Sequence, residues 1–262
     1  MERKMTSLLE LQGVTKRFGG LAAVTDCSLK VFEGKTHGVI GPNGAGKTTV
    51  FNLITGIYCP TKGKILFHEK NITGLRPNQI AQRGIGRTFQ NIRLFKDLTV
   101  LDNVRIAFDT HLCYTAWEAL LSFGRARKGE ADSLCESREL LRKLELERYE
   151  HTVARHLPYG FQRRLEIARA LALRPAILLL DEPAAGMNPV ETERLGEFLQ
   201  WMRDAFRVTI LLIEHHMKLV MKICDSITVL DFGVTIAEGT AEEVRSNHRV
   251  IEAYLGEDGK YE

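Results

Sequence analysis

The sequence has no long uninterrupted run of apolar residues. Its longest apolar stretches, such as residues 177–180 and 210–213, are far shorter than the roughly 20 residues that a membrane-spanning helix needs. At the N-terminus, charged residues interrupt the chain before the apolar core of a signal peptide could form. We therefore expect neither a membrane span nor export, and any contact with a membrane would be made through a partner.

Cysteine is also scarce, and neither sign of charge dominates. The five cysteines are an odd number without a C-x-x-C pair, which indicates neither a disulfide framework nor a zinc cluster. Lys and Arg number 36 against 33 for Asp and Glu, so the chain lacks the basic excess of a dedicated nucleic-acid-binding protein. We expect a reducing compartment and no nucleic-acid partner.

The pattern of apolar residues changes twice along the chain. Alternating apolar and polar residues predict a β-rich entry region from about residue 8 to residue 40. Residues 100–155 carry apolar side chains at helical intervals among charged ones, which predicts a helical lobe. After residue 163, apolar strands alternate with helical stretches, an order typical of a mostly parallel sheet covered by helices. The predicted fold class is therefore α/β.

A glycine-rich segment follows one predicted strand and precedes a predicted helix. It fits G-x-x-x-x-G-K-[ST], the phosphate-binding P-loop, in the structural context that this pattern requires. The backbone amides of such a loop turn toward phosphate oxygens, the lysine adds charge near the β and γ phosphates, and the threonine hydroxyl can hold Mg²⁺. The alternative is a glycine-rich turn with an exposed lysine. The predicted ATP-binding residues of this segment are Gly41, Pro42, Asn43, Gly44, Ala45, Gly46, Lys47, Thr48 and Thr49.

Two adjacent carboxylates, Asp181 and Glu182, end the apolar stretch 177–180. Charged residues at the carboxyl end of a strand lie where open α/β sheets bind their ligands. Asp181 can hold Mg²⁺ through water, and Glu182 can orient or deprotonate an attacking water. The structural alternative is a helix cap by Asp181 with a solvated Glu182. Beside a P-loop, the catalytic interpretation is favoured.

Further motifs resemble those of ABC-type ATPases. Gln90 resembles the Q-loop glutamine, residues 184–189 the D-loop, His215 the switch histidine and Phe18 the aromatic residue that stacks on adenine. Singly, each has an ordinary explanation as a loop, helix-start or core residue, but their order along the chain favours an ABC nucleotide-binding domain. The segment that resembles the ABC signature, followed by an amphipathic helix, consists of Leu157, Pro158, Tyr159, Gly160, Phe161 and Gln162.

The resemblance to ABC ATPases also implies a role for each of these residues. Gln90 and His215 join Glu182 as catalytic residues, and Mg²⁺ is held by Thr48, Gln90 and Asp181. The signature segment covers the ATP that is held by the P-loop of a second subunit. The implied cofactors are therefore ATP and Mg²⁺, and each active site is shared between two subunits.

Among ABC proteins, the chain most resembles the ATP-binding subunits of branched-chain amino-acid importers. The resemblance covers residues 8–256, and its characteristic phrases lie at 86–91, 181–189, 213–215 and 253–257. It implies a P-loop NTPase (ABC ATPase) core with a mostly parallel sheet, an N-terminal antiparallel β region and a helical subdomain.

The expected organisation is a single ABC nucleotide-binding domain. Residues 8–90 and 164–240 would form the β region and the P-loop core, and residues 91–163 the helical lobe. Residues 241–262 would form a C-terminal helix and tail. An insertion near residues 111–131 favours the importer group over the ATPase of lipopolysaccharide export, which looks similar but lacks this segment.

By resemblance, the partners are a second ABC ATPase subunit, in a hetero- or homodimer, and two transmembrane permease subunits. A periplasmic or extracellular substrate-binding protein takes part indirectly. These partners place the chain on the cytoplasmic side of a bacterial inner membrane, held there through the permeases. The expected cargo is branched-chain or other hydrophobic amino acids. This chain does not determine which amino acid is transported, because substrate choice lies in the receptor and the permeases.

The signature segment departs from the general ABC pattern at two positions. Pro158 stands where that pattern has Ser, which removes a hydroxyl and a backbone donor, and Phe161 stands where it has Gln. A residue other than Ser before Tyr-Gly is itself familiar in the importer group. We expect a weaker signature toward the partner's ATP.

Two further alternatives lie outside transport. A soluble ABC-type ATPase of DNA repair or chromosome organisation would interrupt the fold with long coiled coils, but no sustained heptads occur. A non-catalytic nucleotide sensor is disfavoured because Lys47, Asp181, Glu182 and His215 are all present.

Overall fold

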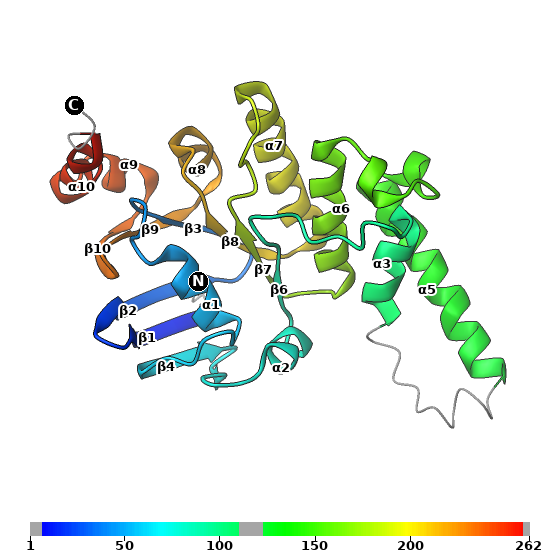
Figure 1. The fold of residues 1–262 in the computed structure, drawn as a ribbon, viewed down its shortest axis with the longest axis horizontal. Helices are drawn as coiled ribbons and strands as arrows, with labels where there is room; N and C mark the ends of the chain where they lie inside the picture. The colour runs from blue at the N-terminus through cyan, green and yellow to red at the C-terminus, as the bar shows by residue number, and fades with distance from the viewer. Residues whose placement is uncertain (1–6, 110–122, 259–262) are drawn as a thin grey trace, which may run out of the picture. The chain divides into compact units, whose positions relative to one another are not determined.

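The computed structural model describes residues 7–109 and 123–258 (Figure 1). The chain divides into two compact units. The first consists of Met1–Arg87 and Ala176–Glu262, and the second is Thr88–Pro175. Most of the expected insertion near residues 111–131 lies outside the described residues, and its last part, from residue 123 onward, belongs to a helix.

An antiparallel sheet opens the first unit. Its strand order is β2-β1-β4-β5, and β1 pairs with both β2 and β4. Buried apolar side chains of β1 and β2, such as Leu11, Val14 and Val31, share one core with helix α1 (Lys47–Ile54). The predicted N-terminal antiparallel region is confirmed. Its strands are β1 (Ser7–Phe18), β2 (Leu21–Phe32), β4 (Lys62–Phe67) and β5 (Lys70–Asn71).

A second sheet, in the order β10-β9-β3-β8-β7-β6, forms the centre of the first unit. All its pairings are parallel except that of β10 with β9. Every residue of β3, β7 and β8 is buried, as expected for parallel strands covered on both faces. The predicted mostly parallel sheet is confirmed. Its strands are β3 (Thr36–Ile40), β6 (Ile85–Arg87), β7 (Ile177–Asp181), β8 (Thr209–Ile213), β9 (Ser226–Asp231) and β10 (Val234–Gly239).

Among the described residues, four helices of the first unit lie between its strands, and two more follow the last strand. At the start of α7, the Asn188 side chain accepts a hydrogen bond from the Glu191 amide at 3.0 Å, and the Glu191 carboxylate accepts one from the Asn188 amide at 2.9 Å. Pro189 occupies the first helical position, where its missing N–H has no cost. Together with α1, these helices are α2 (Pro77–Gln82), α7 (Pro189–Phe206), α8 (Met217–Ile223), α9 (Ala241–Arg245) and α10 (His248–Asp258).

The second unit is helical, as predicted. Its α-helices are α3 (Val100–Asp109), α5 (Phe123–Lys143) and α6 (Tyr159–Ala172), and two short 3₁₀ turns lie at Glu147–Tyr149 and Ala154–His156. We expected the lobe to end at residue 163, whereas the structure groups the chain as far as Pro175 with it, because α6 packs against α3 and α5. None of the described helices is long and apolar enough to cross a membrane.

His37, in β3, is a buried histidine that does not line the cavity beside the P-loop. Its Nδ1 lies 2.7 Å from the Ser226 hydroxyl and its Nε2 lies 2.8 Å from the Thr228 hydroxyl, both on the neighbouring strand β9. Burial lowers the pKa of His37 from 6.5 to about 4, because the charged imidazolium would be cut off from water. The imidazole is therefore neutral in the folded protein at physiological pH.

His37 should make the protein less stable in mild acid. Between pH 6.5 and about 4, His37 is protonated in the unfolded chain but stays neutral in the folded chain. The free energy of unfolding therefore falls as the pH falls, by about 3 kcal/mol over this range. In a His37→Gln variant this contribution should disappear from urea unfolding curves recorded between pH 7.5 and 4. The exposed His248→Gln variant is the control and should keep the wild-type dependence. Equal pH dependence in both variants would contradict the assignment.

Candidate active site

Three neighbouring strands bring the predicted site residues to one edge of the parallel sheet. Ile213, the last residue of β8, pairs with Val39 of β3 on one side and with Asp181 of β7 on the other. Because the three strands are parallel, the segments that follow them leave the sheet at the same edge. This is the edge at which open α/β sheets bind ligands.

The P-loop after β3 has a backbone that depends on its glycines. Gly41, Gly44 and Gly46 have φ values of 147°, 78° and 96°, which L-residues with side chains rarely adopt. A Cβ at Gly41 would lie 2.0 Å from the Leu230 carbonyl oxygen, so no side chain fits there. Lys47 Nζ donates hydrogen bonds to the carbonyls of Gly41 at 2.6 Å and Pro42 at 2.8 Å, which holds its charge against the loop.

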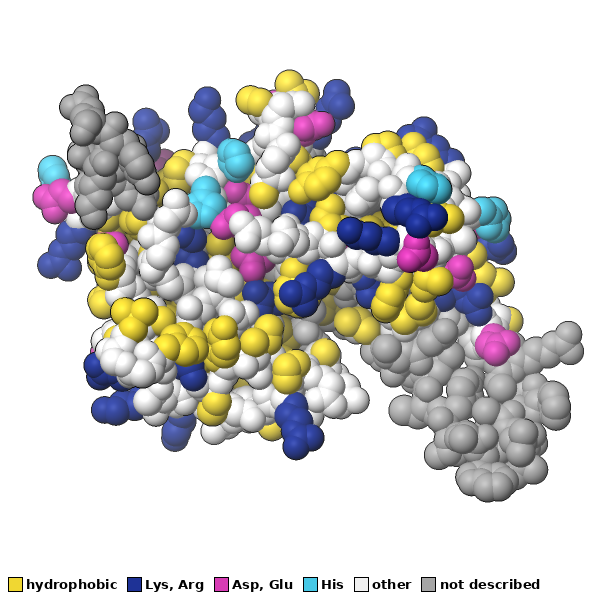
Figure 2. All heavy atoms as spheres, in the orientation of Figure 1, with side chains coloured by type: hydrophobic (Ala, Val, Ile, Leu, Met, Phe, Trp, Pro, Cys, Tyr) yellow, Lys and Arg dark blue, Asp and Glu magenta, His cyan; other side chains and the backbone are white. Residues whose placement is uncertain are grey.

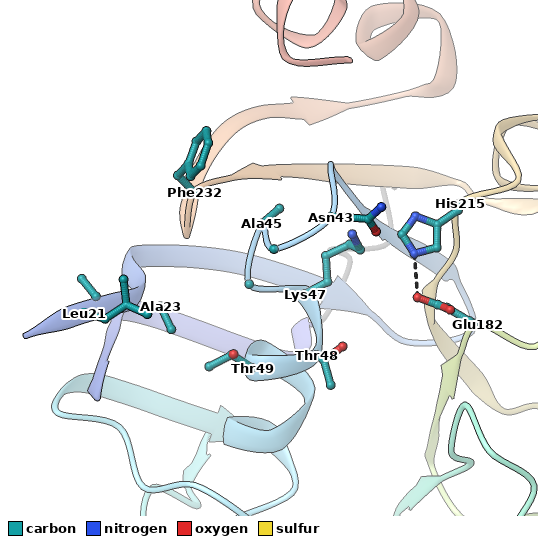
Figure 3. Close-up of a pocket in the computed structure, with 13 residues that line it drawn as sticks. Leu21, Ala23, Asn43, Ala45, Lys47, Thr48, Thr49, Glu182, His215 and Phe232 are labelled. Carbon is teal, nitrogen blue, oxygen red and sulfur yellow. Dashed lines mark hydrogen bonds and ion pairs between the residues drawn. The ribbon is translucent and has the colours of Figure 1, made fainter. Parts of the chain in front are cut away.

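A cavity of about 480 Å³ opens beside this loop in the first unit (Figure 3). It brings together most of the predicted ATP-binding residues and two of the three predicted catalytic residues. The rest of the wall comes from β2 and from the turn between β9 and β10, which carry none of the sequence motifs. The lining residues are Leu21, Ala22, Ala23, Asn43, Gly44, Ala45, Gly46, Lys47, Thr48, Thr49, Glu182, His215 and Phe232.

Glu182 and His215 lie next to each other in the wall of this cavity. His215 Nε2 lies 2.6 Å from Glu182 Oε1, in hydrogen-bond contact (Figure 3). Glu182 has a φ of 48°, an uncommon conformation for a residue other than glycine, and its amide donates to the Ile213 carbonyl at 2.9 Å. Such strain is typical of sites where the surrounding structure holds a side chain in place for a function. On the face seen in Figure 2, histidine and acidic side chains lie side by side in this unit.

Asp181 lies beneath this surface and has a basic partner that sequence analysis missed. Its carboxylate is buried and forms an ion pair with Arg87 at 2.9 Å. Arg87, at the end of β6, also donates hydrogen bonds to the side chains of Asn52 on α1 at 2.7 Å and of Thr55, the C-cap residue of α1, at 3.1 Å. No local pattern in the sequence links Arg87 to Asp181, because the two residues meet through the pairing of β6 with β7.

Phe18, the predicted adenine-stacking residue, is not among the residues that line the cavity. Its ring packs edge-on against Tyr58, with a centroid separation of 5.0 Å, and Lys16 Nζ lies 5.0 Å from its centroid. Leu21 and Phe232 supply exposed apolar side chains to the cavity instead. Stacking of Phe18 on a base therefore stays a prediction.

The signature segment lies in the second unit, at the start of α6. Pro158 is the N-cap residue, and its carbonyl accepts from the amides of Phe161 at 2.9 Å and Gln162 at 3.0 Å. No side chain caps the first turn, which is the physical consequence of proline at this position. Phe161 packs on Tyr149 at 4.9 Å, while a Cβ on Gly160 would meet open space.

Gln90 also belongs to the second unit, where α6 holds its backbone. Arg163 and Glu166 form a buried ion pair at 2.9 Å. Arg163 donates to the carbonyls of Phe89 at 2.8 Å and Gln90 at 3.0 Å, and Glu166 accepts from the Arg93 amide at 3.1 Å. The structure therefore ties Gln90 to the signature helix, and its predicted catalytic and metal-binding roles stay predictions.

Comparison with known proteins identifies the family. The pattern of the ABC transporter family matches residues 24–185, and that of the branched-chain amino acid ATP-binding cassette transporter family matches residues 234–260. The chain is 48% identical, over 95% of its length and 98% of the relative, to the high-affinity branched-chain amino acid transport ATP-binding protein BraF of Pseudomonas aeruginosa. It is 32% identical to the lipopolysaccharide export system ATP-binding protein LptB of Haemophilus influenzae, over 97% and 99% of the two chains.

Solved structures give the same result. The chain superposes with a TM-score of 0.81 on the crystal structure of the ADP conformation of MJ1267, an ATP-binding cassette of an ABC transporter. The two are 29% identical, and the match covers 96% of this chain and 99% of MJ1267. The P-loop, the neighbouring ends of β3, β7 and β8, and the helical unit agree with these matches. The chain belongs to the ABC transporter family, in the group of branched-chain amino acid transport ATP-binding proteins.

Proposed function

We propose that this chain is the ATP-hydrolysing subunit that powers an ABC importer for branched-chain or other hydrophobic amino acids. The observation that carries the proposal is the single cavity that joins the P-loop to the Glu182–His215 contact. The family supplies the link to transport, and the higher identity to a branched-chain amino acid transport protein than to a lipopolysaccharide export protein favours the importer. An ATPase not tied to transport is the remaining alternative.

The P-loop would bind the triphosphate. The amides at the start of α1 and the glycine-rich turn point positive charge toward anionic oxygens. Lys47, held by two loop carbonyls, would add a full positive charge at the β and γ phosphates. These groups stabilise negative charge that develops on the phosphoryl oxygens during transfer.

The donor set also fits Mg²⁺. The Thr48 hydroxyl lines the cavity and the Asp181 carboxylate ends the adjacent strand, and oxygen atoms of this kind are the ligands that Mg²⁺ prefers. Asp181 is buried and paired with Arg87, so it suits contact through a water better than direct ligation. When bound with the nucleotide, Mg²⁺ neutralises phosphate charge. Gln90 is the third proposed ligand.

Glu182 would act on the attacking water. Its carboxylate accepts a proton or orients the water for in-line attack on the γ phosphate. His215, 2.6 Å from Glu182, would fix the orientation of that carboxylate and hydrogen-bond to the γ phosphate. Gln90 would complete this catalytic set.

The working unit would be an assembly. Two ATPase subunits, identical or different, would meet head to tail, with the signature of one over the ATP of the other. Two permease subunits would hold them at the cytoplasmic face of the membrane, and a receptor protein would deliver the amino acid. The test is to purify the chain with its neighbouring gene products and to measure ATP hydrolysis and uptake with a panel of amino acids and the receptor. Hydrolysis unaffected by any hydrophobic amino acid would contradict the proposed cargo.

Glu182→Gln should abolish hydrolysis without abolishing ATP binding. The amide keeps the shape of the side chain but cannot accept a proton from water, so the ATP-bound state should persist. We expect near-complete loss of turnover at this P-loop, measured with the partner's site inactivated, and unchanged nucleotide affinity. The exposed Glu193→Gln variant is the matched control and should hydrolyse ATP normally. Near-normal turnover in Glu182→Gln would exclude Glu182 as the base.

Phe18→Ala tests which aromatic residue contacts the base. If Phe18 stacks on adenine, its loss should weaken ATP binding by about 1–3 kcal/mol, as for base stacking in other nucleotide-binding proteins. Direct titration of Phe18→Ala and Phe232→Ala with ATP compares the predicted residue with one that lines the cavity. If the affinity for ATP is unchanged in Phe18→Ala, Phe18 does not stack on adenine and its role is packing against Tyr58.

The two ATP sites of a heterodimer should differ in rate. This chain offers its partner a signature with Pro158, whereas a partner with an ordinary serine-bearing signature offers the missing hydroxyl and amide to this chain's ATP. A hydrogen bond to a charged phosphate is worth about 1.5–3 kcal/mol, or roughly tenfold to hundredfold in rate. Gly160 and the N-terminus of α6 still supply amides, so the second site should be slower and not inactive.

The asymmetry is measured by inactivating each catalytic glutamate separately in the assembled transporter. The site covered by the Pro158 signature should show the lower residual rate, and Pro158→Ser should raise it. Equal residual rates, or a Pro158→Ser variant without effect on that site, would contradict the expected asymmetry.

A further inference from the structure

Glu214 is a buried carboxylate directly behind the proposed catalytic pair. It follows Ile213, the last residue of β8, and precedes His215 in the chain. Its exposed fraction is 1%, and it does not line the cavity. A carboxylate is seldom buried so deeply without partners, because removal of its charge from water is costly.

The Glu214 carboxylate contacts hydrogen-bond donors from two different segments. Oε1 accepts from the Ala184 amide at 2.7 Å. Oε2 accepts from the amides of His215 at 3.0 Å and His216 at 3.2 Å, and it lies 3.1 Å from His216 Nδ1. An ionised carboxylate has acceptor sites for all four contacts.

These contacts link the two segments that carry the catalytic pair. Ala184 lies two residues after Glu182 in the segment that leaves β7, while His215 lies in the segment that leaves β8. The two segments also contact each other through the pair itself and through the hydrogen bond that the Glu182 amide donates to the Ile213 carbonyl. Glu182 also has a left-handed backbone, which the surrounding structure must hold against its strain.

A purely local role does not explain the geometry. A carboxylate near the start of α8 is favourable beside the first amides of that helix, which accounts for the contacts to His215 and His216. It does not account for Oε1, whose partner Ala184 lies in the other segment. The contact to Ala184 is therefore the observation that distinguishes a link between segments from a helix cap.

We infer that Glu214 is a positioning residue that ties the segments after β7 and β8 together and so keeps His215 in contact with Glu182. The inference rests on the proposed function, because it assigns Glu214 a role in that same reaction. Glu214 is buried and does not line the cavity, so its proposed role is positioning and not catalysis.

Glu214→Gln is the first variant. It replaces one acceptor oxygen with a donor group, so either the His215 and His216 amides or the Ala184 amide lose their partner. A displacement of about 1 Å in a catalytic group can lower a rate by as much as a hundredfold. We expect kcat for ATP hydrolysis to fall about tenfold to hundredfold, with directly measured ATP affinity within threefold of wild type. Glu193→Gln, exposed and outside the site, is the matched control.

A double-mutant cycle on kcat separates positioning from an independent effect. If Glu214 acts through His215, adding Glu214→Gln to a His215→Ala variant should change kcat by less than threefold. Multiplied losses, or a loss of ATP affinity as large as the loss of kcat, would overturn the inference. Should the Gln variant not fold, Glu214→Ala removes the buried charge and adds no donor, and it is measured in the same cycle.

A second readout does not depend on catalysis. The imidazole ¹⁵N signals of His215, recorded in the full chain, report its hydrogen bond to Glu182. They should move in Glu214→Gln toward those of Glu182→Ala and stay unchanged in Glu193→Gln. Absence of ATP hydrolysis by the wild-type assembly would refute the proposed function, and unchanged His215 signals in Glu214→Gln would refute the positioning role, so the two failures are distinguishable.

Discussion

The pairing of β8 with β3 on one side and with β7 on the other is the constraint on which the candidate site depends. Ile213 pairs with both Val39 and Asp181, so the three strands end in register. All residues of the three strands are buried, which specifies that register strongly, because a slip by one residue would turn every side chain to the opposite face. The P-loop, the two carboxylates and the segment that carries His215 therefore leave the sheet together.

The same edge concentrates buried charge, and the fold satisfies that charge with fixed partners. Asp181 pairs with Arg87, Glu214 accepts from backbone amides of two segments, and Lys47 donates to two loop carbonyls. A buried charge without such partners would cost several kcal/mol, so the geometry of these groups is closely restricted. Groups held in this way need little rearrangement when charge develops on a phosphate, which is the physical basis of electrostatic catalysis.

Much of this candidate site could be predicted from the sequence, because each of its motifs is a short continuous segment with a characteristic backbone conformation. A P-loop between a strand and a helix predicts where a phosphate binds. Carboxylates at the end of an apolar strand predict where a metal ion or an attacking water would lie. The partners of these residues come from distant segments, and no local pattern links Arg87 to Asp181 or Glu214 to Ala184. The cavity wall at Phe232 depends on how the turn between β9 and β10 docks on the P-loop, where the Gly233 amide donates to the Ala45 carbonyl at 3.0 Å. Nothing in the sequence indicates that the helix after residue 163 packs with the helical lobe, whereas the structure groups α6 with α3 and α5.

In the proposed function, the ATP phosphates bind in the P-loop cavity of the first unit, with Glu182 at the γ phosphate. A crystal structure of the Glu182→Gln chain with ATP and Mg²⁺ tests it most directly. We expect a triphosphate surrounded by the amides of residues 43–48 with Lys47 against it, and a base near the wall formed by residues 21–23. A triphosphate bound outside this loop, or a residue-182 side chain directed away from the γ phosphate, would contradict it.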